Sequence, residues 1–216
     1  MTAVVKNVNN KLEKIPLDNL PENSTILVQT GEKSVQVAQA QNVNHVVNLI
    51  LPAMTPGPIG SGASVNLNMD YYNLFVIGDE TFCDGHFIVP KDRALTECMS
   101  QDVKVKFSAL GKDAVSQIKT FPSIFACENH GYGKTDDTHQ AYFGLVTDVR
   151  IQDNGIKIYF RPLSAIPQQR LNEIAFKLAV QCASSFNELN RTHWTIKKVN
   201  LIEELKAAGI SVLAPT

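Results

Sequence analysis

The chain has 216 residues, of which 44% are hydrophobic and 19% are charged, and its formal net charge is −1 at pH 7. This length fits one ordinary domain with an appendage, or two small domains. The charge balance argues against a broad nucleic-acid interface, which needs a clustered basic surface. No apolar run reaches the roughly 18 residues of a membrane-spanning helix, so no membrane span is predicted.

The first residues and the cysteines indicate the compartment. The N-terminus lacks a charged segment followed by an apolar one, so no secretion signal is predicted. The four cysteines are widely spaced and do not form the pattern of a disulfide framework: Cys83, Cys98, Cys127 and Cys182. We therefore expect reduced thiols in a cytoplasmic protein.

Residues 1–51 are predicted to form a strand-rich association segment. Two strands are expected at 25–29 and 34–38, joined by a turn at 30–33, and a third strand within 42–51. Amide side chains recur along this stretch, at Gln29, Gln36, Gln39, Gln41, Asn42, Asn44 and Asn48. Such side chains stack as ladders when identical strands align in register.

Part of this segment, at about residues 34–48, resembles the RHIM-like and bacterial amyloid-signalling motifs. Those motifs carry an aliphatic-Gln-aliphatic-Gly tetrad followed by Asn-rich residues. The residues of interest are Val35, Gln36, Val37, Gln41, Asn42, Asn44 and Val46, and Ala38 stands where the motif has glycine. The resemblance implies a homo-oligomer, or recruitment of a protein with a similar strand segment, in bacterial signalling or anti-phage defence. The alternative is a meander that packs within its own domain.

Residues 52–66 are predicted to be a linker, because they contain three prolines and three glycines. Residues 67–216 should then form a mixed α+β domain with an antiparallel sheet and two C-terminal helices. Its first strand is expected at 71–77, and residues 81–89 are expected to return as the partner strand.

The next apolar residues fit two kinds of element. Val103, Val105 and Phe107 alternate with lysines, as in a strand, but Leu110 continues the apolar positions at helical spacing. A helix is expected over 112–119, and it must end before Pro122 because the residue preceding a proline disfavours the α conformation.

The clearest element is a hairpin. Apolar and polar residues alternate from Phe143 to Gln152 and again from Ile156 to Arg161, which is typical of half-buried strands. The sequence Asp153-Asn154-Gly155 lies between them, and Asn-Gly favours a type I′ turn. Other elements must cover the apolar face, because an isolated hairpin is marginal in water.

Two helices are predicted after the hairpin. Pro167 suits the first turn of a helix whose apolar residues recur at helical spacing, at Leu171, Ile174, Ala175, Leu178 and Cys182. Asn200 and Glu203 have the spacing of a capping box, and Gly209 suits the residue after the end of the last helix.

Three residues of the loop after residue 127 are candidate catalytic residues: Glu128, His130 and His139. A histidine beside carboxylates is the minimum for general acid–base catalysis or metal-assisted hydrolysis. However, no serine, cysteine or threonine nucleophile lies in a recognisable turn, and a solvated polar loop explains the same residues. A non-enzymatic assembly protein is therefore the favoured hypothesis, and a hydrolase-type enzyme is the alternative.

Two Cys-x-x-His pairs are candidate metal ligands: Cys83, His86, Cys127 and His130. Two cysteines and two histidines can close a tetrahedral zinc site. The usual zinc signature is Cys-x-x-Cys, and buried free cysteines are common. We therefore expect no cofactor, with zinc as the alternative.

Near the C-terminus, Arg191, Lys197 and Lys198 form a short basic stretch. It is interpreted as the solvated flank of a helix, and the alternative is a local nucleic-acid patch. The pair His193-Trp194 is predicted to lie at the edge of the core, where the indole N–H needs an acceptor. A ligand-stacking role is the alternative for this pair.

Overall fold

The computed structural model divides the chain into two compact units, Met1–Val65 and Asn66–Thr216. The residues that it describes are 3–8, 11–16, 27–29, 36–38, 46–51, 63–182 and 186–212. Its first strands pair two by two: β1 (Ala3–Val8) with β2 (Lys11–Pro16), β3 (Leu27–Gln29) with β4 (Gln36–Ala38), and β5 (Val46–Leu51) with β6 (Ala63–Asn68). Strands β3, β4 and β5 lie within the three strands predicted for this stretch.

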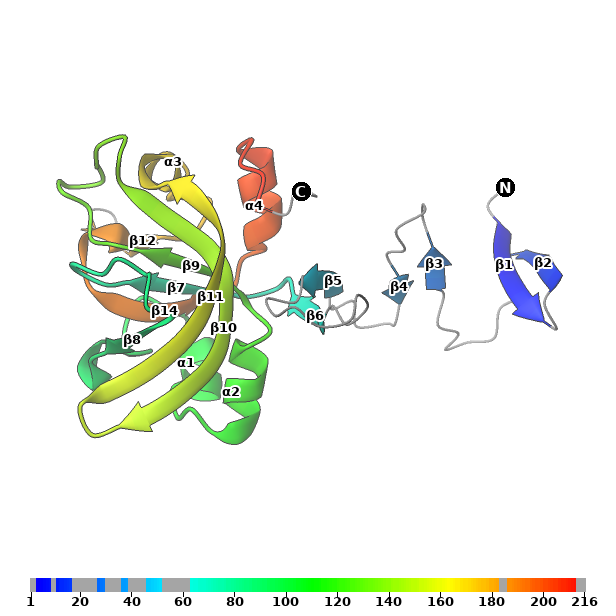
Figure 1. Ribbon diagram of the computed structural model, residues 1–216, viewed down its shortest axis with the longest axis horizontal. Coiled ribbons are helices and arrows are strands. Elements are labelled where there is room, and N and C mark those ends of the chain that lie inside the picture. The colour runs from blue at the N-terminus through cyan, green and yellow to red at the C-terminus, as the bar shows by residue number, and fades with distance from the viewer. Residues whose placement is uncertain are drawn as a thin grey trace. The chain divides into compact units, whose positions relative to one another are not determined.

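Six strands of the second unit form one mixed sheet (Figure 1). Across the sheet their order is β14 (His193–Lys197), β7 (Tyr72–Val76), β9 (Pro122–Ala126), β10 (Gln140–Gln152), β11 (Gly155–Pro167) and β8 (His86–Val89). Strands β7 and β9 are parallel, and the other neighbouring pairs are antiparallel. The α+β class is as predicted, but the sheet contains this parallel pair. Strand β8 pairs with β11 and not, as expected, with β7.

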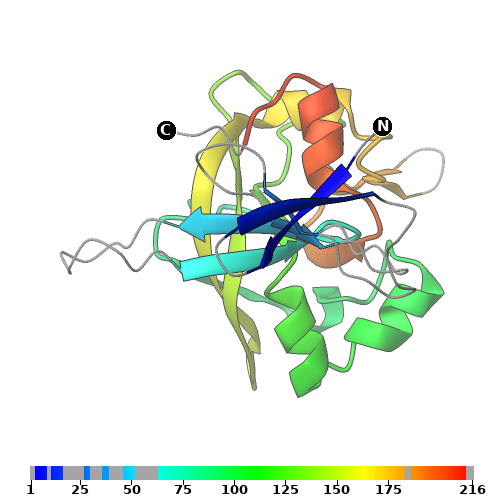
Figure 2. The same cartoon turned by 90° about the vertical axis from the view of Figure 1, so that its right-hand side faces the viewer.

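The remaining elements of the second unit connect and cover this sheet. They are η2 (Lys91–Arg93), α1 (Gln101–Phe107), α2 (Lys112–Ile118), α3 (Gln168–Glu173), the strand pair β12 (Gln181–Cys182) and β13 (Phe186–Asn187), η3 (Glu188–Asn190) and α4 (Leu201–Ala207). Figures 1 and 2 show α1 and α2 towards one end of the curled sheet and α4 towards the other.

Each side of the sheet has its own hydrophobic core. The core that includes α1 and α2 is rich in aromatic side chains, among them Phe75, Phe87, Phe125, Phe160 and Trp194. The core that includes α3 and α4 is mainly aliphatic, with Leu74, Ile124, Leu171, Leu201 and Leu205. Strands β7 and β9 contribute to both cores, and all their residues are buried. Strands buried on both faces are expected to be mainly apolar, and the two polar residues here, Asn73 and Ser123, form a hydrogen bond with each other at 3.1 Å.

The segment around Val105 is helical. Val103 and Phe107 lie four residues apart and are buried, whereas Val105 is 72% exposed. The helical spacing therefore decides the structure of this segment, and the apparent alternation with lysines reflects the exposed side of α1.

The hairpin is present, but its turn differs from the prediction. Gln152 pairs with Gly155, so the turn residues are Asp153 and Asn154, and neither has a positive φ angle. The expected type I′ turn is therefore wrong. Gly155 has φ +150° and lies so close to β8 that a Cβ atom would contact Val89 O at 2.7 Å.

The two long hairpin strands reach both cores because their pairing is irregular. The register shifts between Phe143 and Gly144, and again between Val146 and Asp148. A bulge changes which face of the sheet the following residues occupy. As a result, Phe143 packs in the aliphatic core and Val149 packs in the aromatic core.

The C-terminal helices follow the predicted signals in part. Asn200 Oδ1 accepts a hydrogen bond from Glu203 N at 3.2 Å, which caps α4. Gly209, with φ +71°, follows the helix, and Ile210 N donates to Leu205 O at 2.8 Å, as in a Schellman motif. In contrast, α3 ends at Glu173, well before the predicted end of that helix.

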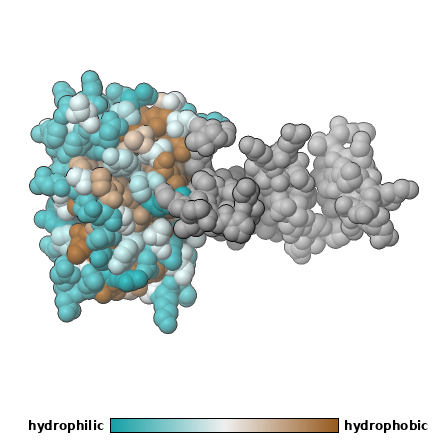
Figure 3. All heavy atoms as spheres, in the orientation of Figure 1, coloured by the Kyte–Doolittle hydropathy of each residue, from teal (hydrophilic) through white to brown (hydrophobic). Residues whose placement is uncertain are grey.

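The face of the second unit seen in Figure 3 is largely hydrophilic, with hydrophobic areas between the hydrophilic ones. The large apolar side chains that are exposed in this unit come from different elements: Ile88, Val105, Tyr132, Ile151 and Phe176. None of the helices that the structure describes is long and apolar enough to cross a bilayer.

Gly144 should be required at the bulge. A Cβ atom at this position would lie 2.2 Å from Arg161 O, so Gly144→Ala must displace the backbone of β11. We expect a loss of about 1–3 kcal/mol in the free energy of unfolding, measured by urea denaturation. Gly131→Ala is the control, because its Cβ would meet only Lys134 O at 3.8 Å. Equal stabilities of the two variants would contradict this account of the bulge.

Candidate functional site

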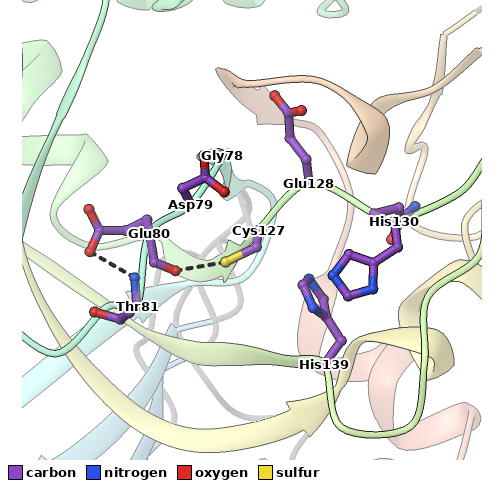
Figure 4. A pocket seen from close by; sticks show the side chains of 9 residues that line it. Gly78, Asp79, Glu80, Thr81, Cys127, Glu128, His130 and His139 are labelled. Carbon is purple, nitrogen blue, oxygen red and sulfur yellow. Dashed lines mark hydrogen bonds between the residues drawn. The ribbon is translucent and has the colours of Figure 1, made fainter.

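The three predicted catalytic residues border one cavity of about 490 Å³ (Figure 4). Glu128 and His130 follow strand β9, and His139 precedes β10. Asp79 and Glu80, which follow β7, line the same cavity. Because β7 and β9 are parallel neighbours, the segments after them leave the sheet at the same edge. The cavity therefore combines three carboxylates with two imidazoles.

His130 and Asp136 form the closest ionic contact in this loop. His130 Nδ1 lies 2.8 Å from Asp136 Oδ2, and both side chains are at least half exposed. Asp136 also accepts hydrogen bonds from the hydroxyl and the backbone N–H of Thr138. These bonds, with a smaller contribution from His130, lower the pKa of Asp136. The carboxylate therefore stays ionised and orients the imidazole so that Nε2 is available to accept a proton.

His139 lies against His130, with ring centroids 4.5 Å apart (Figure 4). Burial lowers the pKa of His139, and repulsion between the two imidazoles in their protonated forms lowers it further. Its Nε2 atom is buried and has no hydrogen-bond partner among the described residues. The neutral imidazole is therefore favoured at this position.

Glu128 has a structural contact that the sequence did not predict. Its Oε1 accepts a hydrogen bond from Thr192 N at 2.6 Å, and Thr192 Oγ1 accepts one from Gly78 N at 2.8 Å. In Figure 4 the Glu128 carboxylate points away from the two imidazoles. This carboxylate thus joins the segments that follow β7, β9 and η3.

A network of amide side chains holds the loop in place. Asn129 accepts from Gln168 and Asn172, and it donates to Asn172 and Asn190, at 2.9–3.2 Å. Asn190 also accepts from Gly133 N at 2.9 Å. All four hydrogen-bonding positions of the Asn129 amide are therefore used. The loop is polar, but it is fixed to α3 and η3.

The predicted zinc ligands do not converge. Cys127 and His130 border the cavity, whereas His86 lies on the edge strand β8. The Cys127 thiol donates to Glu80 O at 2.7 Å, and burial raises its pKa, which favours the thiol over the thiolate. Cys83 is exposed. Within the described ranges no group of three or more His, Cys, Asp or Glu side chains is arranged to bind a metal ion.

The predicted interaction residues are only partly within the described structure. Gln36 and Val37 lie in β4, and Val46 begins β5. The others, Val35, Gln41, Asn42 and Asn44, lie outside the described residues. The pairing of β3 with β4 places Gln29 opposite Gln36.

The three residues of the C-terminal basic stretch have different surroundings: Lys198 is exposed, as predicted, and Arg191 Nε lies 3.2 Å from Glu97 Oε1. Lys197 lies on β14 and is buried. Trp194, on the same strand, is fully buried, and its indole N–H donates to Asn73 Oδ1 at 3.4 Å. The indole N–H thus has the acceptor that was predicted, but Trp194 lies within the aromatic core and not at its edge.

Asp79 and Glu80 were missed because the parallel pairing of their strand was not predicted. A signal for it exists in the sequence. Two apolar runs, now β7 and β9, are separated by helical segments, which is typical of parallel strands. Polar residues that follow such runs gather at one edge of the sheet.

Comparisons of the chain with protein-family models, with curated proteins and with solved structures found no match. Its function is therefore inferred from its own residues and their geometry.

The lowered pKa of His139 predicts an acid-sensitive contribution to stability. The unfolded chain takes up a proton at this histidine near pH 6.5, before the folded chain does. The contribution of the neutral His139 to the free energy of unfolding is complete above about pH 6.5. It is lost as the pH falls through the pKa that His139 has in the folded chain. We expect His139→Gln to show a smaller loss of unfolding free energy than the wild type between pH 7 and pH 5, by chemical denaturation. If the unfolding free energies of His139→Gln and of the wild type change equally with pH, the pKa of His139 is the same in the folded and the unfolded chain. That result would contradict the prediction.

Proposed function

We propose that this chain is a non-enzymatic assembly protein that oligomerises, or recruits a partner, through its N-terminal strands. One observation carries the proposal: the described strands before residue 68 pair only two by two. A two-stranded ribbon is marginal in water, because it has no third strand or helix to cover its apolar face. Additional strands from another chain would supply that cover.

The edges of these ribbons provide the means of assembly. An edge strand presents unpaired N–H and C=O groups, and another chain can pair with them. Gln29 and Gln36 lie opposite each other across β3 and β4, so an added copy in register would continue a row of amides. The resemblance to RHIM-like motifs supports the same mode of assembly, and a setting in bacterial signalling or anti-phage defence.

Charged residues introduced into these strands should weaken oligomerisation. Val37→Asp combined with Val46→Lys would place ionised groups in a dry interface, where each costs several kcal/mol. We expect the wild type to be oligomeric and the double variant to be smaller, by light scattering after size-exclusion chromatography.

Two controls distinguish assembly through these strands from other causes. Lys206→Gln changes one exposed charge on α4 and should keep the wild-type mass. Residues 67–216 contain both hydrophobic cores and should be monomeric. A monomeric full chain would contradict the proposal. So would an oligomer of residues 67–216 with the same number of chains as the wild-type oligomer.

The contact between His130 and Asp136 favours a second candidate, a hydrolase-type enzyme that uses the 128–139 loop. In this reading Asp136 holds His130 Nδ1 at 2.8 Å, and Nε2 takes a proton from water as water attacks the substrate. Water is the nucleophile because Cys127 is held as the thiol. The amide network fixes the loop and so lowers the cost of orienting the base.

The enzymatic candidate predicts a loss of activity without a loss of fold. His130→Ala should lower the hydrolysis of a p-nitrophenyl ester or phosphate ester by about 10²–10⁴-fold, because the general base is removed. His130 is 60% exposed, so stability should change by less than about 0.5 kcal/mol. His86→Ala, on the edge strand, is the control. Wild-type activity in His130→Ala, or no activity in the wild type, rejects this candidate.

A further inference from the structure

A buried cluster of charged side chains lies away from the loop described above. Glu188 is 0% exposed, His193 is 2% exposed and Lys197 is 5% exposed. Glu188 Oε1 lies 2.6 Å from Lys197 Nζ, and Glu188 Oε2 lies 3.1 Å from His193 Nε2. Removing such groups from water costs several kcal/mol for each ion, so a cluster of this kind needs a structural or functional reason.

One carboxylate faces two basic side chains in this cluster. His193 Nδ1 lies 2.7 Å from Arg191 O, while Nε2 faces the Glu188 carboxylate. The carboxylate of Glu188 is therefore shared between His193 and Lys197.

A cavity of about 410 Å³ opens beside this cluster. Glu188 and Lys197 line it, Met99 and Ile196 contribute apolar surface, and Gln181 and Lys198 add polar groups. Its volume lies within the range of small-molecule sites. Two lysines, Lys197 and Lys198, and one carboxylate, Glu188, line the cavity, so the formal charge of its lining is positive.

The backbone is strained at two residues that line the cavity. Cys98 has φ +59° and Ala179 has φ +53°, and both residues line the cavity. Left-handed conformations of residues other than glycine are unfavourable and gather at ligand-binding sites. The Cys98 carbonyl accepts hydrogen bonds from Thr195 Oγ1 and Lys197 Nζ, which hold this conformation. Among the described residues, Lys197 Nζ thus has two hydrogen-bond acceptors for its three N–H groups.

We propose that this cavity binds a small organic anion, with a carboxylate or phosphate group and a short apolar body. The anionic group accepts hydrogen bonds from the third N–H of Lys197 and from Lys198, and it balances the formal positive charge of the cavity lining. The apolar body lies against Met99 and Ile196. This site is independent of the N-terminal strands and of the His130 loop.

Calorimetric titration of the full chain tests the site directly. The probes are sodium butyrate and sodium phosphate, each at constant ionic strength, with butylammonium chloride as the cation of matched size. We expect saturable binding of butyrate, of phosphate or of both, and none of butylammonium. Butyrate binding alone identifies a carboxylate ligand, and phosphate binding alone identifies a phosphate ligand. Binding of neither anion, or equal binding of butylammonium, overturns the proposal.

Variants locate the binding without disturbing the buried cluster. Lys198→Gln should weaken anion binding by about tenfold, because one charged donor is lost. Gln181→Trp, at an exposed position on β12, should block the cavity and abolish binding. Lys206→Gln removes an exposed charge elsewhere and should leave binding unchanged. Wild-type affinity in both Lys198→Gln and Gln181→Trp would place the bound anion at another site and overturn the proposal.

Discussion

The parallel pairing of β7 with β9 is the constraint on which the rest of the second unit depends. The two strands lie in the middle of the sheet, and every residue in them is buried. Their side chains alternate between the cores: Phe75 stacks on Phe125 at 5.3 Å on one side, and Leu74 and Ile124 pack on the other. A displacement of either strand by one residue would exchange the faces of these side chains and disrupt both cores.

The same pairing determines where polar chemistry can lie. Because both strands end at one edge, the turn after β7 and the loop after β9 form a common cavity. Such a loop would ordinarily be mobile, since polar loops have few apolar contacts. Here the fully bonded Asn129 amide and its partners on α3 and η3 replace those contacts. A fixed polar loop on a rigid sheet is suited to orient His130, whether or not the chain catalyses a reaction.

The sequence predicted those elements whose signals are local. The hairpin that contains Val149, the cap at Asn200 and the glycine at position 209 each depend on neighbouring residues, and each was found. The pairing of β7 with β9 has no local signal, because it joins strands that are separated by two helices. Only the order of apolar runs and helical segments along the chain indicates it. The hydrogen bonds of Asn129 and the contact between Glu188 and Lys197 depend on that tertiary arrangement, so a single sequence indicates the residue types but not their contacts.

Amide hydrogen exchange on the full chain tests most directly the claim that β7 and β9 form a rigid centre that fixes the polar loop. The account predicts the slowest exchange at Phe75 and Phe125. The N–H groups of Asn129 and Gly133 donate to Leu189 O and Asn190 Oδ1. The account therefore also predicts that these two amides exchange more slowly than the amides of the exposed turn at residues 153–154. Exchange at Asn129 and Gly133 as fast as in that turn, or loss of protection in β7 and β9 before β10 and β11, would contradict it.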